Sequence, residues 1–171
     1  MPIKRSSERS GPTPKLTDPY LVSKAYPEPT ICPSCGLVYH KKRWLRDEHI
    51  KTTVEKIAEK HKCPACRKIE DHYVMGVVAI SGTFVSSTKN EIINIIRNQE
   101  KKESLRNPLA RIMSLNHKES MITVETTVEN LAIAIGKALQ SAYNGELKIS
   151  FSDNEKLVRV YWHRDLETKK K

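Results

Sequence analysis

The chain has 171 residues and is basic, because 30 Lys and Arg against 20 Asp and Glu give a formal net charge of +10. Its hydrophobic content of 38% suffices for one modest core, and no apolar run approaches the ~20 residues of a membrane-spanning helix. The first residues also lack the apolar segment of a secretory signal, so we expect a cytoplasmic protein without a membrane partner. The charge favours a polyanionic partner, RNA above all, or serves solubility alone.

Residues 1–30 are predicted to form a disordered, basic, proline-rich tail. They contain six of the nine prolines of the chain and few large apolar side chains. A segment of this composition buries too little apolar surface to offset the entropy that it would lose on ordering. The opposite end, residues 166–171, finishes in three lysines and is predicted to form a second basic tail.

All four cysteines of the chain fall in two Cys-Pro-x-Cys pairs, Cys32 with Cys35 and Cys63 with Cys66. Two residues between cysteines let both sulfurs face one metal ion from a single turn, and two such turns complete the tetrahedral set of a structural zinc site. A thioredoxin-type redox motif needs only one pair, and disulfides need an oxidising compartment. The sequence therefore predicts one structural zinc ion in a module of residues 31–71, with a helix from Asp47 to His61 between the pairs.

A basic segment that contains one aromatic residue follows the first cysteine pair. Lysine and arginine neutralise phosphates, although a solvated face is the alternative for these cations. The tryptophan can stack on an unpaired base, or it can equally pack inside the zinc module. Two further cations follow the second pair and are expected to extend the patch, because both pairs converge on the metal. The predicted RNA-binding residues are Lys41, Lys42, Arg43, Trp44, Arg46, Arg67 and Lys68.

Residues 72–165 are predicted to form the packed domain. Apolar patterns and turn residues indicate a strand at 73–84, a helix at 90–105, strands at 111–115 and 122–126, a helix from a capping box at 126–129 to Asn144, and strands at 147–151 and 158–162. The order β-α-β-β-α-β-β predicts an α+β fold, a ferredoxin-like split βαβ domain with an extra C-terminal strand. Two helices would cover one sheet face and leave the other available to a partner or to the zinc module.

Several short motifs resemble those of known proteins. They are Cys32-Pro-Ser-Cys-Gly36, Arg43-Trp44, Cys63-Pro-Ala-Cys-Arg67, Gly82-x-Phe84 and Arg111-Ile112-Met113. With these motifs, the stretch 31–162 resembles a family of small, functionally uncharacterised bacterial zinc-finger proteins. In its architecture and cysteine pattern alone, the chain more distantly resembles the N-terminal zinc-bearing part of the large ribosomal subunit export adaptor, a family also named for nonsense-mediated decay. That resemblance implies a partner in the large ribosomal subunit.

The sequence shows no motif of an enzyme. A Cys₄ set leaves zinc no open position for a water molecule, and phosphate-binding glycine loops and zinc-protease motifs do not occur. We therefore predict a non-enzymatic zinc-binding protein that binds structured RNA, in the ribosome, as an assembly, hibernation or translation-associated factor. The alternatives are a regulatory module that docks a protein on its open sheet face, and a thiol-based redox sensor that releases zinc on oxidation.

Overall fold

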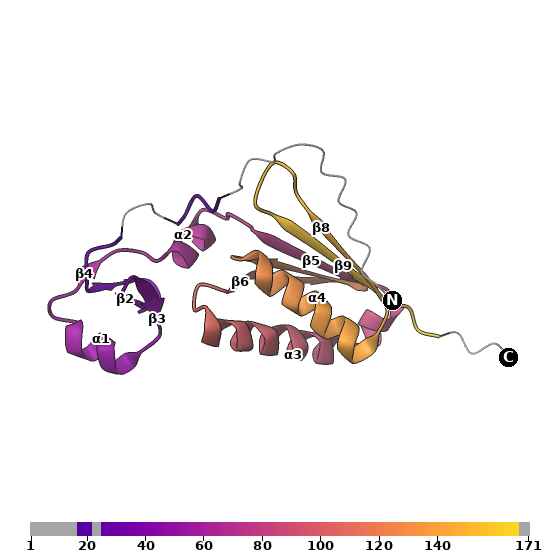
Figure 1. The fold of residues 1–171 in the computed structure, drawn as a ribbon. Coiled ribbons are helices and arrows are strands. Elements are labelled where there is room, and N and C mark those ends of the chain that lie inside the picture. Colours follow the sequence, from indigo (N-terminus) through magenta and orange to yellow (C-terminus); the bar gives the residue numbers. More distant parts are fainter. Residues whose placement is uncertain (1–16, 22–24, 168–171) are drawn as a thin grey trace.

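Two separate sheets organise the protein, and they confirm the predicted α+β fold class. The computed structural model describes residues 17–21 and 25–167, and it places a small cysteine-bearing module beside a larger two-layer domain (Figure 1). Within these ranges, no helix combines the length and apolarity needed to cross a membrane.

The cysteine-bearing module is built on a four-stranded sheet in the order β3-β2-β1-β4. Its central strands are antiparallel, whereas β4 pairs with β1 in parallel. A tight turn at Lys41 and Lys42 joins β2 to β3, and both turn residues have positive φ. The elements are β1 (Thr30–Ile31), β2 (Val38–His40), β3 (Arg43–Leu45), α1 (Glu48–Val54), β4 (Glu59–Lys60) and α2 (Pro64–Glu70).

Helix α1 ends earlier than the predicted helix of residues 47–61. It begins as expected, because the Asp47 carboxylate accepts the backbone N–H of Ile50 at 3.0 Å and caps the helix. After Val54, however, the chain turns and pairs with the module's sheet: the N–H of Glu59 donates to the carbonyl of Pro29 at 3.0 Å. Ile57, which lies within the predicted longer helix, is therefore exposed.

The larger domain has one five-stranded sheet in the order β6-β7-β5-β9-β8. The order of elements along the chain is the predicted one. The last strand, β9, does not extend the edge of the sheet; it lies between β5 and β8, parallel to β5 and antiparallel to β8. The elements are β5 (Gly76–Ser81), α3 (Thr83–Arg106), β6 (Ile112–Lys118), β7 (Met121–Thr126), α4 (Glu129–Tyr143), β8 (Glu146–Phe151) and β9 (Val158–His163).

The hydrophobic core lies between this sheet and helices α3 and α4, which run together along one of its faces (Figure 1). Helix α4 approaches the sheet closely at Gly136, where an added Cβ would lie 2.4 Å from Val160 Cγ1. The fully buried side chains include Val78, Ile80, Ile92, Ile96, Ile122, Leu131, Ile135, Leu139 and Trp162. The opposite face of the sheet carries none of the described helices.

The starts of the two long helices depend on contacts and breaks that the sequence pattern did not show. Helix α3 includes a first segment from Thr83, where the Asp165 carboxylate accepts the N–H of Thr83 at 2.9 Å, and its backbone leaves helical geometry at Thr88 (φ −121°, ψ 18°). The predicted helix from residue 90 matches the segment after this break. Helix α4 lacks the predicted capping box: Val128 is its N-cap residue, and the hydroxyl of Thr126 donates to the Val128 carbonyl at 2.8 Å.

Part of the predicted N-terminal tail packs against the two modules. In residues 17–21 the side chain of Asp18 is buried, and in residues 25–30 Thr30 pairs within the small sheet. The rest of that predicted tail, residues 1–16 and 22–24, lies outside the described residues, as do residues 168–171 of the C-terminal tail.

Candidate metal centre and basic hairpin

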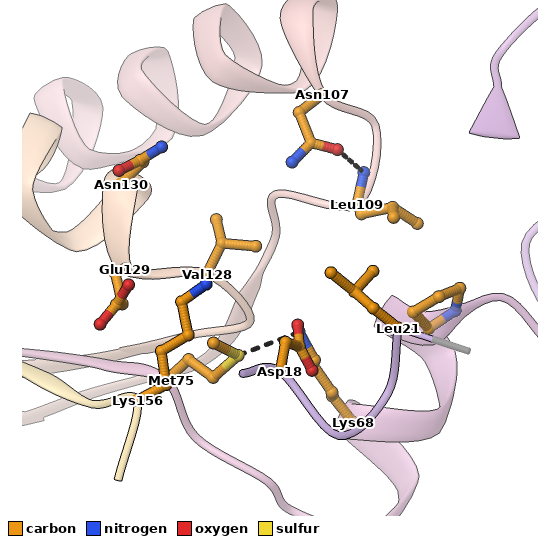
Figure 2. Close-up of a pocket in the computed structure, with 11 residues that line it drawn as sticks. Asp18, Leu21, Lys68, Met75, Asn107, Leu109, Val128, Glu129, Asn130 and Lys156 are labelled. Carbon is orange, nitrogen blue, oxygen red and sulfur yellow. Dashed lines mark hydrogen bonds and ion pairs between the residues drawn. The ribbon is translucent and has the colours of Figure 1, made fainter. Parts of the chain in front are cut away.

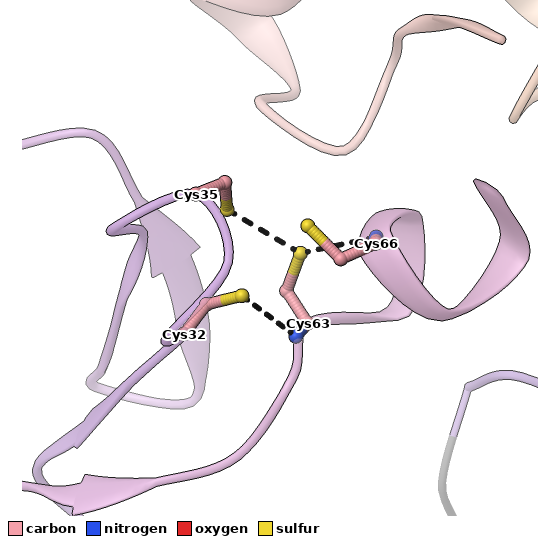
Figure 3. Close-up of side chains that lie close together, drawn as sticks. All are labelled: Cys32, Cys35, Cys63 and Cys66. Atoms are coloured by element: carbon pink, nitrogen blue, oxygen red, sulfur yellow. Dashed lines mark hydrogen bonds between the residues drawn. The ribbon is translucent and has the colours of Figure 1, made fainter. Parts of the chain in front are cut away.

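The four cysteines form a single cluster, as their spacing predicts. Their Sγ atoms all lie within 4.8 Å of one another (Figure 3), and the Sγ atoms of Cys35 and Cys63 are 3.7 Å apart. Tetrahedral zinc with ~2.3 Å bonds to sulfur places ligand sulfurs about 3.8 Å apart. The donor set therefore fits one structural zinc ion held by Cys32, Cys35, Cys63 and Cys66, and the predicted cofactor is confirmed.

Backbone N–H groups orient the sulfurs. The first pair lies in the turn between β1 and β2, where Gly36 has a φ of 77° and its N–H donates to the Cys32 carbonyl at 2.9 Å. The second pair opens helix α2: Cys63 is its N-cap residue, and its sulfur accepts the N–H of Cys66 at 3.4 Å. The N–H of Cys63 in turn donates to the sulfur of Cys32 at 3.3 Å. Such bonds favour the thiolate form that a metal requires.

A guanidinium from the larger domain completes the surroundings of the cluster. Arg111 lies between α3 and β6, and it donates to the sulfur of Cys35 at 3.1 Å and to that of Cys66 at 3.3 Å. Burial opposes its charge, but the hydrogen bond to Cys35 and the nearby thiolates outweigh burial and raise the pKa of Arg111 above its usual range. Four thiolates around Zn²⁺ leave a charge of −2, which this cation partly balances.

The thiols of the metal-free cluster differ strongly in acidity. The hydrogen bond from Cys63 lowers the pKa of Cys35 to about 4, with Arg111 acting in the same direction and burial opposing both. The same shared proton, together with burial, raises the pKa of Cys63, and burial raises the pKa of Cys66. Zinc would displace the remaining protons, so its binding is coupled to their release.

An aromatic cluster supports the hairpin of β2 and β3 on its inner side. Trp44 is only 8% exposed, and its ring centroid lies 5.1 Å from that of Tyr26 and 5.3 Å from that of Tyr39. The sequence left two roles open for Trp44, and in the structure its side chain packs inside the zinc module. An RNA base has no exposed face of this ring on which to stack.

The four remaining cations of the first patch are exposed. Lys41 and Lys42 form the turn, Arg43 follows in β3, and Arg46 lies just after it. The turn is held by Glu28, whose carboxylate accepts the N–H of Lys41 at 2.9 Å and that of Lys42 at 2.8 Å. The structure therefore brings these cations together on one short, fixed hairpin, named here the basic hairpin.

The two cations after the second cysteine pair lie elsewhere and have internal partners. Arg67 donates to the Tyr20 carbonyl at 2.8 Å. Lys68 is 3% exposed; it pairs with the buried carboxylate of Asp18 and donates to the Thr127 carbonyl at 3.1 Å. Arg67 and Lys68 thus fasten the N-terminal segment and join α2 to the larger domain, and they do not extend the exposed patch.

A cavity of about 280 Å³ lies beside this buried ion pair (Figure 2). It is lined by the N-terminal segment, α2 and the start of α4, with Met75 and Leu109 among its apolar walls. Burial raises the pKa of Glu129 at its rim, while the nearby Lys156 opposes that shift. The cavity marks the seam between the two modules.

Sequence reasoning missed Arg111 and Asp18 as structural partners of the metal module. The sequence placed Arg111 at the start of a predicted strand and Asp18 in the predicted tail. Neither carries a local signal, because each partner lies 45 residues or more away along the chain.

Comparisons with known proteins give no relative: no protein-family model matches the chain, no curated protein is significantly similar in sequence, and no solved structure matches it. The resemblances to the bacterial zinc-finger family and to the export adaptor therefore stay predictions.

Proposed function

We propose that this is a non-enzymatic RNA-binding protein in which zinc supports a basic hairpin that contacts the phosphates of structured RNA. The observation that carries the proposal is the grouping of Lys41, Lys42, Arg43 and Arg46, all exposed, on one hairpin of the zinc module. Neutralising phosphates with such cations releases counterions, which drives binding without a sequence requirement.

The hairpin is ordered before any partner arrives. Its turn is held by two hydrogen bonds to Glu28, and Trp44 on its inner side packs on the rings of Tyr26 and Tyr39. The first cysteine pair comes just before the hairpin in the sequence. Because less freedom is then lost on binding, each phosphate contact contributes more to affinity.

The terminal segments contain much of the positive charge of the chain. Residues 1–16, 22–24 and 168–171 contain eight of the 30 Lys and Arg but only one of the 20 Asp and Glu. The described part of the chain therefore has a small excess of positive charge, and a local group such as the basic hairpin decides where a polyanion binds. The terminal cations would strengthen attraction to any RNA without adding specificity.

The ribosome, and its large subunit in particular, is the partner that the distant resemblance to the export adaptor favours. The test is co-sedimentation of the full chain with ribosomes of its source organism at low and at moderately high salt. We expect association with one subunit that weakens as salt rises. The double charge reversal K42E/R43E should weaken binding and lower the salt dependence by about two phosphate contacts.

A matched control separates the hairpin from net charge. K101E/K102E makes the same charge change at two exposed lysines of α3 and should bind nearly as well as the wild type. Equal losses in both variants would assign binding to net charge, and an unchanged K42E/R43E would exclude the hairpin. Free migration of the wild type at both salts would refute the RNA partner and place the protein-docking alternative first.

A further inference from the structure

None of the described helices covers the face of the five-stranded sheet that points away from α3 and α4 (Figure 1). Side chains alternate along each strand, so the residues between the core positions form this face. On β9 the buried residues are Val158, Val160 and Trp162, and the intervening Arg159, Tyr161 and His163 are exposed.

Tyr161 lies on this open face in β9, between the central strand β5 and the edge strand β8. The residue is 45% exposed, and its register partners are Ala79 of β5 and Lys148 of β8. Ala79 is small and pairs in turn with Thr123 of β7, so the surface beside the ring is low and flat. A planar group can therefore lie against the Tyr161 ring without meeting a large neighbour.

The charges around Tyr161 suit a phosphate backbone. Arg159 lies two residues before it, Lys148 lies directly across on β8, and both are exposed. The row of register partners through Tyr161 contains no carboxylate: it runs Lys148, Tyr161, Ala79, Thr123 and Asn116.

Each of the two neighbouring rows contains one carboxylate. Glu146 of β8 is exposed and pairs in register with His163, whereas Glu125 of β7 already has partners. The carboxylate of Glu125 accepts the hydroxyl of Ser114 at 2.6 Å and lies 3.5 Å from the ring of His72. It is therefore less repulsive to an anion than a free carboxylate would be, and the cations near Tyr161 remain available.

We infer that this open sheet face binds a single-stranded segment of RNA, with one base stacked on Tyr161 and adjoining phosphates against Arg159 and Lys148. Single-strand binders combine such an aromatic platform with flanking cations, and every base offers a face for stacking. The inference rests on the proposed RNA-binding function and deepens it. The basic hairpin would contact the phosphates of folded RNA, and the sheet would bind an unpaired stretch of the same RNA.

The test is fluorescence anisotropy of the full, zinc-loaded chain with labelled oligouridine and, separately, with a blunt RNA duplex. Tyr161→Ala should weaken oligouridine binding about five- to a hundredfold, the range seen when a stacking aromatic is removed. Tyr161→Phe keeps the ring and should bind like the wild type. Phe151→Ala is the matched control, because Phe151 is 54% exposed and lies on β8 in phase with the half-buried Leu147 and Ile149, on the helix side of the sheet.

The outcomes separate this inference from the proposed function. Duplex binding without oligouridine binding, or a Tyr161→Ala variant that binds oligouridine as the wild type does, would overturn the sheet site and leave the hairpin in place. Equal losses in Tyr161→Ala and Tyr161→Phe would overturn stacking. Failure of the wild type to bind either RNA would overturn both, and the sheet face would then be a candidate for protein docking.

Discussion

Arg111 is expected to strengthen zinc binding from outside the ligand set, and Arg111→Met tests this. Methionine keeps much of the length and apolar stem of arginine but removes the charge and all the guanidinium donors. The backbone of Arg111 should stay in place, because its N–H donates to the Thr127 hydroxyl at 2.9 Å and its carbonyl accepts the Thr127 N–H at 3.0 Å. The substitution therefore removes mainly the contacts to sulfur.

The size of the effect follows from two charged hydrogen bonds, at 3.1 Å to Cys35 and 3.3 Å to Cys66. Bonds of this kind contribute ~1.5–3 kcal/mol each when dry, and Arg111 is only partly buried, so less than the full sum applies. Loss of an outer partner of a metal site typically lowers metal affinity about 10- to 100-fold. We expect a loss of zinc affinity in that range.

Competition with a chromogenic zinc chelator measures this affinity directly, and circular dichroism checks that the variant is folded. Arg106→Met is the control, since Arg106 is a largely exposed arginine whose ion-pair partner is Glu103, at 3.5 Å. If Arg111→Met is folded and binds zinc as tightly as Arg106→Met, the guanidinium contributes nothing to the metal site and the argument from its contacts fails.

Two further predictions concern the seam between the modules. Lys68→Met leaves the Asp18 carboxylate buried without its partner and should lower the free energy of unfolding by about 3–5 kcal/mol in denaturant titrations. Adding Asp18→Asn to this variant should recover part of the loss. An unchanged unfolding midpoint for Lys68→Met would contradict the buried pair. The hydrogen bond that Tyr20 donates to Asp71 raises its pKa to about 12. Because this folded pKa exceeds the unfolded value of about 10, the stability from this contact is complete below pH ~10 and is lost as pH rises through ~12. Tyr20→Phe should therefore remove a late phase from the alkaline absorbance titration of the tyrosines, and a profile that keeps this phase would contradict the contact.

The metal ligands and the buried faces of the strands could be predicted from the sequence, because they depend on the spacing of nearby residues. Two residues between cysteines determine which sulfurs face one metal, so the ligand set followed from the sequence alone. The alternation of Val158, Val160 and Trp162 likewise predicted a strand with one buried face. Alternation shows which side chains face the core, but it does not show which strands are neighbours, and the position of β9 between β5 and β8 had no local signal.

Long-range polar contacts were beyond the same reasoning. The proline-rich segment before Thr30 has few large apolar side chains, which is why it was predicted as a tail. Its described parts, residues 17–21 and 25–29, pack through single specific contacts: Asp18 pairs with Lys68, and the Tyr20 carbonyl accepts from Arg67. The ring of Tyr26 adds an aromatic contact with Trp44. Composition reports how much apolar surface a segment can bury, and it carries no information about single polar contacts formed across 40 residues or more.

These contacts give zinc a second consequence beyond folding its own module. Helix α2 supplies two metal ligands, and through Lys68 it also reaches the Thr127 carbonyl of the larger domain. The hydroxyl of Thr127 accepts a hydrogen bond from the N–H of Arg111, and the guanidinium of Arg111 donates to the cysteine sulfurs. Metal, helix and domain thus form one closed set of contacts. Removing zinc should loosen several of them together, so we expect metal loss to weaken the junction between α2 and the larger domain as well as the fold of the metal module.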